Sequence, residues 1–485
     1  MTYLPTAFLF FLPWLPPPAV ASPPPAPAFF ERSAVLLNLS ERSLNRILLD
    51  TFHANGGPRV AGERARVSSR VTDLRYQANL SDPVLRLFED GSARLSLQVL
   101  DANLRIGRLG RKPDGSGARC EEAGLDVDPA QPLQVDLALD LAIEDRALRL
   151  IPKSVEIADL ENRLLLVGPT RCTNSLFPTW FLWWVGKPFI RHSMDNLDTL
   201  LLERARKGAA RLESREALVG QDWGAELRLF PDALDTRGGS LLLGLTASSA
   251  DAPAHASPRP GLPAKEGMPT ESFLGISESL ANEASRRIFS RKARFHTSSS
   301  LGAQRLLSSD AIYALIPGLR AVGSREQLDL DVAFHEAPRL EFDQTSDGQA
   351  LIRVLVSGVD LHIQRHQGDQ VTRLGTLHIA SGRMGAVPFP NVLGGISFRA
   401  VENRWTTSSS GLEFDDAMVA ATLQELAFGK IFQTSYAPLL TRNLRIGDTE
   451  FVPRSFTARD GYLVIGLEER SPEVATRTDN LLGSR

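Results

Sequence analysis

Several stretches of the chain alternate strictly between apolar and polar or small residues. Leu133–Ile143, Leu328–Phe334 and Val359–Ile363 each place a large apolar side chain at every second position. Because successive side chains of a strand point to opposite faces, this pattern predicts antiparallel strands with one apolar and one solvated face. The apolar phase changes between Leu95–Val99 and Ala102–Ile106, which predicts a β-bulge.

Two segments combine a short apolar strand with a helical pattern. Residues 37–52 read LNLSERSLNRILLDTF, and residues 274–289 read LGISESLANEASRRIF. In each, the strand ends at a serine, Ser40 or Ser277, whose hydroxyl can accept a hydrogen bond from the first turn of the helix that follows. Two helices are therefore predicted, over 41–53 and 278–289.

The first of these helices carries one continuous apolar face, with Leu44, Ile47, Leu48, Thr51 and Phe52 at positions i, i+3, i+4, i+7 and i+8. Asn55-Gly56-Gly57 follows it and predicts a left-handed cap. The candidate site residues of the two helices are Leu44, Ile47, Leu48 and Phe52 in the first, and Leu280 and Ile288 in the second.

A second pair of matching segments lies further along the chain. FPDALDTRGGSLLLGL (230–245) matches VPRSFTARDGYLVIGL (452–467), and both predict hairpins that turn at a glycine, Gly239 or Gly461. Two matched ends on either side of a Pro-rich stretch indicate a tandem duplication, with chance similarity as the alternative. The predicted order is a first domain at 31–249, a linker at 250–271, a second domain at 272–470 and a polar tail at 471–485.

Each half also contains a later helical pattern, over 176–207 and over 415–437. Pro188 should kink or break the first of these. Its amino-terminal part holds the densest aromatic cluster of the chain. Such side chains could form ordinary core, line an apolar pocket or contact a membrane interface. The candidates taken from this region are Trp180, Trp183, Trp184, Met194 and Leu197.

Composition and charge narrow the classes of function. The 485 residues are 43 % hydrophobic and 23 % charged, which is typical of a globular protein. The formal net charge of −3 gives no bulk attraction to nucleic acid. We therefore expect no nucleic-acid partner.

The amino terminus has the pattern of a secretory signal peptide. An apolar run at residues 7–15 is followed by Ala19-Val20-Ala21, whose small residues predict cleavage near Ala21. An uncleaved anchor is the alternative, but nine apolar residues are far fewer than the ~20 that span a bilayer. The expected location is secreted or periplasmic.

Export changes the interpretation of the two cysteines. In an oxidising compartment Cys120 and Cys172 are expected to form a disulfide, which would stabilise the fold by about 4 kcal/mol through loop closure. Two buried free thiols are the alternative.

The order of strand, capped helix, long meander, second helix and closing hairpin resembles the tubular lipid-binding superfamily, which includes bactericidal/permeability-increasing protein and the lipid-transfer proteins. The resemblance rests on 37–52, 274–289, the Pro-rich seam and the two closing hairpins. It implies an α+β fold made of two tandem copies of a long, highly twisted antiparallel sheet wrapped on one or two helices, in a boomerang shape. It also implies an apolar pocket in each barrel, and a disulfide in the first domain is common in the family.

The resemblance leads to a functional hypothesis. We expect a non-enzymatic protein that binds phospholipid or lipopolysaccharide acyl chains for transfer, sensing or sequestration, with transient membrane contact. Moving a ~16-carbon tail into water costs about 13 kcal/mol at ~0.8 kcal/mol per CH₂, so a carrier needs a dry apolar interior. The strand residues proposed for its walls are Leu137 and Leu139 in the first half, and Leu330 and Val332 in the second.

Two other functions remain open at this stage. One is a structural envelope protein of the same fold whose barrels are filled, and the other is a hydrolase on a β-rich scaffold. No common nucleophile or metal motif occurs, and His362 and His366 lie in a predicted strand, about 13 Å apart. The sequence therefore predicts no metal site and no cofactor.

Overall fold

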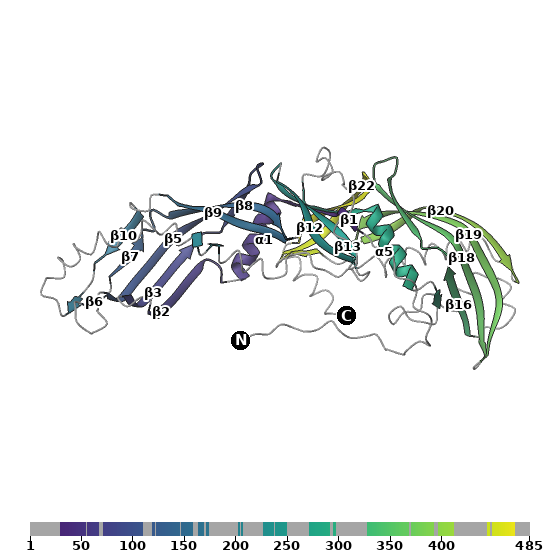
Figure 1. The fold of residues 1–485 in the computed structure, drawn as a ribbon, viewed down its shortest axis with the longest axis horizontal. Helices are drawn as coiled ribbons and strands as arrows, with labels where there is room; N and C mark the ends of the chain where they lie inside the picture. The colour runs from purple at the N-terminus through teal and green to yellow at the C-terminus, as the bar shows by residue number, and fades with distance from the viewer. Residues whose placement is uncertain are drawn as a thin grey trace.

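The computed structural model describes five stretches of the chain, 30–173, 227–249, 271–296, 327–411 and 444–470, and four positions in 202–206. Within these stretches, 55, 67–70, 110–118, 122, 146, 159–162, 169–170, 237, 292–293, 368–369, 392–395 and 447–448 are not described. We call 30–249 the first half and 271–470 the second half. The molecule is elongated, with one curved sheet at each end and a third sheet between them (Figure 1).

The central sheet takes strands from both halves. Its order is β12-β13-β1-β14-β23-β22-β21, so that β1 of the first half pairs antiparallel with β14 of the second half. The strands are β1 (Phe30–Ser40), β12 (Leu227–Asp235), β13 (Ser240–Ser249), β14 (Phe273–Ser277), β21 (Leu444–Ile446), β22 (Thr449–Arg459) and β23 (Tyr462–Glu469).

The pairing of β1 with β14 follows the duplication. The sequence repeat equates Leu37 with Leu274, and these two residues face each other across the two strands. The repeat also equates Leu36 with Phe273, and Asn38 with Gly275. Replacing each residue by its equivalent therefore turns the Leu36–Gly275 pair into the Phe273–Asn38 pair, on the other side of Leu37–Leu274. A pseudo-two-fold axis therefore passes through the Leu37–Leu274 pair.

The two closing hairpins match each other even in the position of a register shift. In each, a proline faces a leucine and the register then shifts by one residue, as in a β-bulge. The glycines at the turns have positive φ, 66° at Gly239 and 75° at Gly461. The two halves are thus copies of one unit, and the α+β fold of twisted antiparallel sheets is confirmed.

The first half carries a ten-stranded sheet built around the long strand β5. Along β3 and β5 the register shifts at Leu100, so the predicted bulge is confirmed. The strands are β2 (Arg59–Arg66), β3 (Val71–Leu80), β4 (Val84–Leu87), β5 (Ser92–Leu109), β6 (Arg119–Glu121), β7 (Ala123–Val127), β8 (Leu133–Glu144), β9 (Ala147–Ile157), β10 (Leu164–Val167) and β11 (Arg171–Thr173).

The second half carries a six-stranded sheet, in which β15-β16-β18-β19-β20 are neighbours and β17 pairs with β18. The strands are β15 (Arg294–His296), β16 (Gln327–Phe334), β17 (Arg339–Gln344), β18 (Ala350–Gln367), β19 (Gln370–Pro390) and β20 (Ile396–Ser410). His362 and His366 both belong to β18, as the alternation predicted.

Each half has one described helix of more than a few residues, α1 (Glu41–Ala54) or α5 (Glu278–Arg291). The backbone N–H of Ser43 donates to Ser40 Oγ at 3.1 Å, and that of Leu280 donates to Ser277 Oγ at 3.0 Å, so both predicted caps form. Gly56 and Gly57 follow α1 with positive φ, as expected for its left-handed end. Among the described residues, no helix has both the length and the apolar character that crossing a bilayer requires.

Each helix is joined to a neighbouring strand, β4 or β17, by the same set of side-chain to backbone hydrogen bonds. Asn45 Nδ2 donates to Leu85 O at 2.9 Å, and its Oδ1 accepts from the Leu85 N–H at 2.6 Å. Asn282 bonds Leu340 of β17 in the same way, at 2.9 and 2.7 Å. The carboxylates of Glu41 and Glu278 each accept a further strand N–H. We call each of these Glu and Asn pairs a helix–strand clamp.

Several predictions fall outside the described residues. These are the signal peptide, the linker apart from Glu271, the polar tail, the helix at 415–437 and the helix at 176–207 apart from Leu202, Glu203, Ala205 and Arg206. The two cysteines occupy facing positions, since Cys172 of β11 is the register partner of Cys120 of β6. Facing positions are compatible with a bridge, and the disulfide stays a prediction.

Candidate functional site

An apolar stripe runs along one face of the first-half sheet. On β8 it consists of the alternating apolar residues from Leu133 to Ile143, which cover about 33 Å at ~3.3 Å per residue. Facing residues of an antiparallel pair share a face of the sheet, so the stripe widens onto β5 and β9. Its rows are Leu97–Val135–Ile157, Leu95–Leu137–Val155, Ala93–Leu139–Pro152, Leu141–Leu150 and Ile143–Leu148.

Most of this stripe is only half-buried. Ala93, Leu133 and Leu139 are buried, but Leu95, Leu97 and Leu137 keep part of their surface exposed, as do the residues nearer Ile143. Leu141 and Leu148 pack against the main core beside the central sheet. The stripe thus starts at the core and continues along the arm as incompletely covered apolar surface.

Helix α1 shows the same incomplete burial. Leu44, Ile47, Leu48 and Phe52 form its predicted apolar face, and all four are half-buried. Ser43 is the one buried residue of this helix. Leu44 and Ile47 contact the same core cluster as Leu141 and Leu148, so the helix and the stripe meet at that end.

The opposite face of β8 is solvated and charged. Asp140 pairs with Lys153 at 2.7 Å, and Arg149 pairs with Glu144 at 3.2 Å. Ser96 donates a hydrogen bond to Asp136 at 2.5 Å. These contacts keep the polar face of the strand outward and the apolar stripe toward the interior of the arm.

The corresponding surfaces of the second half are closed. Val354 of β18 faces Leu340 as Leu95 faces Leu85, and it faces Met384 of β19 as Leu95 faces Leu137. Val354, Met384 and the next pair along these strands, Ile352 and Ala386, are 0–7 % exposed. Val332, a predicted wall residue, faces Leu361 and belongs to the same core cluster.

Helix α5 is more completely buried than α1, and its side chains at the matching positions are smaller. Leu44, Ile47 and Leu48 correspond to Ala281, Ala284 and Ser285, all of which are buried. Ser285 Oγ donates to the Pro338 carbonyl, and Phe289 meets Phe334 edge to face with ring centroids 4.8 Å apart. These contacts hold α5 against its sheet.

An ion pair at equivalent helix positions has reversed polarity in the two halves. Arg46 and Asp50 pair at 3.2 Å in α1, and Glu283 and Arg287 pair in α5. Arg46 and Asp50 are 40 % and 24 % exposed, whereas Glu283 and Arg287 are 9 % and 6 % exposed. The burial of the charged pair again shows that α5 is covered where α1 is open to solvent.

The candidate residues therefore separate into three groups. Most of the described first-half candidates are half-buried: Leu44, Ile47, Leu48, Phe52 and Leu137. The sixth, Leu139, is buried, with 7 % of its surface exposed. Leu280 and Val332 are core residues of the second half, and only the backbone of Ile288 and Leu330 is described. The tryptophans Trp180, Trp183 and Trp184, with Met194 and Leu197, lie outside the described residues.

Sequence reasoning missed the remainder of the stripe on β9. Leu148, Leu150 and Val155 line its outer edge, yet Pro152 and the irregularity beside Leu139 interrupt their alternation. Their apolar character was visible in the sequence, but only the register shows that they extend the stripe.

One cluster of charged groups in the second half lies on the outer face of its sheet. Asp360 accepts hydrogen bonds from His378 Nδ1 at 2.7 Å and His335 Nε2 at 2.9 Å. The bond from His378, followed by that from His335, holds the pKa of Asp360 below its ordinary value. Among the described residues no cluster of His, Cys, Asp and Glu has the geometry of a metal site.

Comparisons with known proteins show similarity at the level of the fold only. No protein-family model matches the sequence, and no curated protein matches it. A solved structure of a lipopolysaccharide binding protein aligns with a TM-score of 0.42 and 13 % identity, covering 90 % of this chain and 98 % of that one. P47 of Clostridium botulinum E1 aligns with a TM-score of 0.27 and 8 % identity, over 90 % of this chain and 98 % of its own.

Proposed function

We propose that this protein binds lipid acyl chains along the apolar stripe of its first half, and that its second half is a filled scaffold. The observation that carries this proposal is the unequal burial of two copies of one fold. The apolar face of the helix and the stripe on the sheet are partly exposed in the first half, whereas the equivalent surfaces of the second half are buried. This narrows the expectation of two lipid-binding barrels to one.

The dimensions of the stripe suit this ligand. Its length of about 33 Å exceeds the ~15 Å of one tail layer, which is half of the ~30 Å hydrocarbon core of a bilayer, so an extended tail fits along it. The partly exposed leucines and valines of the stripe would be stabilised by about 25 cal/mol for each Å² of apolar surface that a ligand removes from water. A lipid with one or two tails, phospholipid or lipopolysaccharide, is therefore the proposed ligand class.

We propose that the protein carries lipid and catalyses no reaction on it. Sequestering an acyl chain from water needs a continuous apolar surface and no acid–base group, and the stripe contains none. We further propose that the protein works outside the cytoplasm, as its amino-terminal pattern predicts. Transfer, sensing and storage of lipid share this step.

Two adjacent residues of β5 provide a matched test. Leu97 lies in the stripe half-buried, while the next residue, Gln98, is exposed on the opposite face. Leu97→Trp should fill part of the stripe and lower bound lipid, whereas Gln98→Trp should leave the load unchanged. Each protein is purified from its native host, extracted with organic solvent and analysed by mass spectrometry.

The result supports the proposal if lipid co-purifies in stoichiometric amount and falls only in Leu97→Trp. Protein without lipid, which also fails to take up a labelled phospholipid, would instead favour a structural envelope role. Turnover of an ester substrate would favour the hydrolase.

A further inference from the structure

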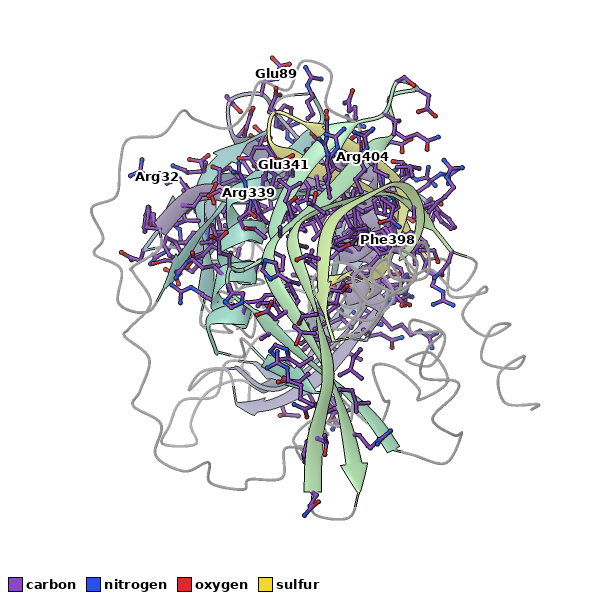
Figure 2. The ribbon with its side chains drawn as sticks, turned by 90° about the vertical axis from the view of Figure 1, so that its right-hand side faces the viewer. Arg32, Glu89, Arg339, Glu341, Phe398 and Arg404 are labelled. Carbon is purple, nitrogen blue, oxygen red and sulfur yellow. The ribbon has the colours of Figure 1, made fainter. Side chains whose placement is uncertain are left out.

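The outer face of the second-half sheet carries a row of arginines across four strands. Arg339 of β17 faces Leu355 of β18, Leu355 faces Arg383 of β19, and Arg383 faces Arg404 of β20. Facing residues share a face, so the three guanidinium groups lie on one side of the sheet, over about 14 Å at ~4.8 Å per strand. We call Arg339, Arg383 and Arg404 the arginine row; Figure 2 labels the first and last of them on the upper part of the sheet.

Most acidic groups near the arginine row already have cationic partners. Glu402 pairs with Arg353 at 3.1 Å and with Arg383 at 3.2 Å, reaching Arg353 over the small Gly385. Asp343 also pairs with Arg353. Asp360 is held by its two histidines.

Two arginines of the row remain available for an external anion. Arg339 and Arg404 are exposed, and neither forms an ion pair with another described residue. Glu341, the neighbour of Arg339 on the same face, is the acidic group here that pairs with no described residue. Beside the row lie the exposed hydroxyls of Ser357, Ser381 and Thr406, which face one another across β18, β19 and β20.

We propose that this face docks on an anionic membrane surface, with the arginine row contacting lipid phosphates. Guanidinium groups bind phosphate oxygens through two parallel hydrogen bonds, and adjacent hydroxyls can donate to the same oxygens. The row is a local excess of positive charge on a chain whose net charge is −3, so the contact depends on this face and not on bulk charge. This site is separate from the apolar stripe and does not rest on lipid carriage there.

The test compares two double variants with the same change in net charge. Arg339→Gln with Arg404→Gln removes the two available arginines. Arg75→Gln with Arg454→Gln removes two exposed arginines, one from the first-half sheet and one from the central sheet. Binding of the full-length proteins is measured by co-sedimentation with vesicles of phosphatidylcholine alone, or of phosphatidylcholine and phosphatidylglycerol in equal parts.

The expected loss for the first pair is roughly 25-fold on the anionic vesicles, since each basic residue near an anionic membrane contributes about five-fold, or ~1 kcal/mol. The control pair should bind as the unmodified protein does. Glu341→Gln should bind about five-fold more tightly for the same reason. All these differences should shrink in 1 M salt, where the Debye length is ~3 Å.

Equal loss in both double variants would overturn the proposal, as would failure of the unmodified protein to bind anionic vesicles. Binding to duplex DNA or inorganic phosphate in place of vesicles would also overturn it. Lipid content measured on the same preparations separates this result from the first proposal, because the arginine variants should keep the lipid load that Leu97→Trp loses. Circular dichroism confirms that each variant is folded.

Discussion

Asp360 accepts hydrogen bonds from two imidazoles that reach it from different elements, His378 on β19 and His335 after β16. These bonds favour the charged carboxylate, so the pKa of Asp360 lies below its ordinary value of 3.8. A carboxyl group with a lowered pKa stabilises the fold above its unfolded-state pKa. That contribution is lost as the pH falls through the folded-state pKa.

Asp360→Asn should therefore lower the melting temperature near neutral pH, where the unmodified carboxylate is charged. The difference between the two proteins should disappear as the pH approaches 2. Thermal melts followed by circular dichroism across this range measure it, with Glu341→Gln as the control. A difference that stays constant with pH would show that the carboxylate charge is not the cause.

At the scale of the element, the helix–strand clamps decide where each helix lies. Asn282 is bonded through both its amide nitrogen and its amide oxygen to Leu340, and Asn45 is bonded in the same way to Leu85. Each clamp closes a loop of about 40 to 60 residues, so it fixes tertiary contacts rather than local helix stability.

Asn282→Ala should lower the free energy of unfolding by about 1–3 kcal/mol, because it leaves the strand amide of Leu340 without its partner. Ser279→Ala, at an exposed position of the same helix, should change it by less than ~0.5 kcal/mol. Urea denaturation followed by fluorescence gives both values. Equal effects of the two substitutions would contradict the importance of the clamp.

At the scale of the whole molecule, the two halves share one sheet and a set of polar bonds across it. Ser43 and Ser272 hydroxyls lie 2.6 Å apart, Thr449 donates to Asp50 at 2.7 Å, and Tyr462 donates to the Ser33 carbonyl at 2.8 Å. Leu37, 7 % exposed, sits at the pseudo-two-fold axis between the halves. Contacts of this kind should make the halves unfold together.

Leu37→Ala should cost about 2–5 kcal/mol, as is usual for a buried leucine. Because the residue joins the halves, hydrogen exchange should quicken in both β8 and β18. Leu97→Ala, in the half-buried stripe, should affect β8 far more than β18. Exchange measured by mass spectrometry distinguishes these outcomes, and loss of protection confined to the first half in Leu37→Ala would contradict the shared core.

Local patterns in the sequence predicted α1, α5 and fewer than half of the described strands. Alternation located several of these strands, and a change of its phase located the bulge at Leu100. Serine caps and glycines placed the helix ends to within a few residues, since these features act over one turn. The duplication could also be recognised in the sequence, because the equivalent turns of the two halves both need a glycine with positive φ.

The sequence by itself determined the periodicity of the regular strands and helices, such as β8 and α1, and hence which of their side chains share one face. Tertiary structure alone decided the pairing of β1 with β14, the row formed by Arg339, Arg383 and Arg404, and the unequal burial of the two halves. The reason is physical. A period of two or 3.6 residues fixes the direction in which a side chain points. Whether that side chain is buried depends on how closely segments that are hundreds of residues apart in the sequence pack against it.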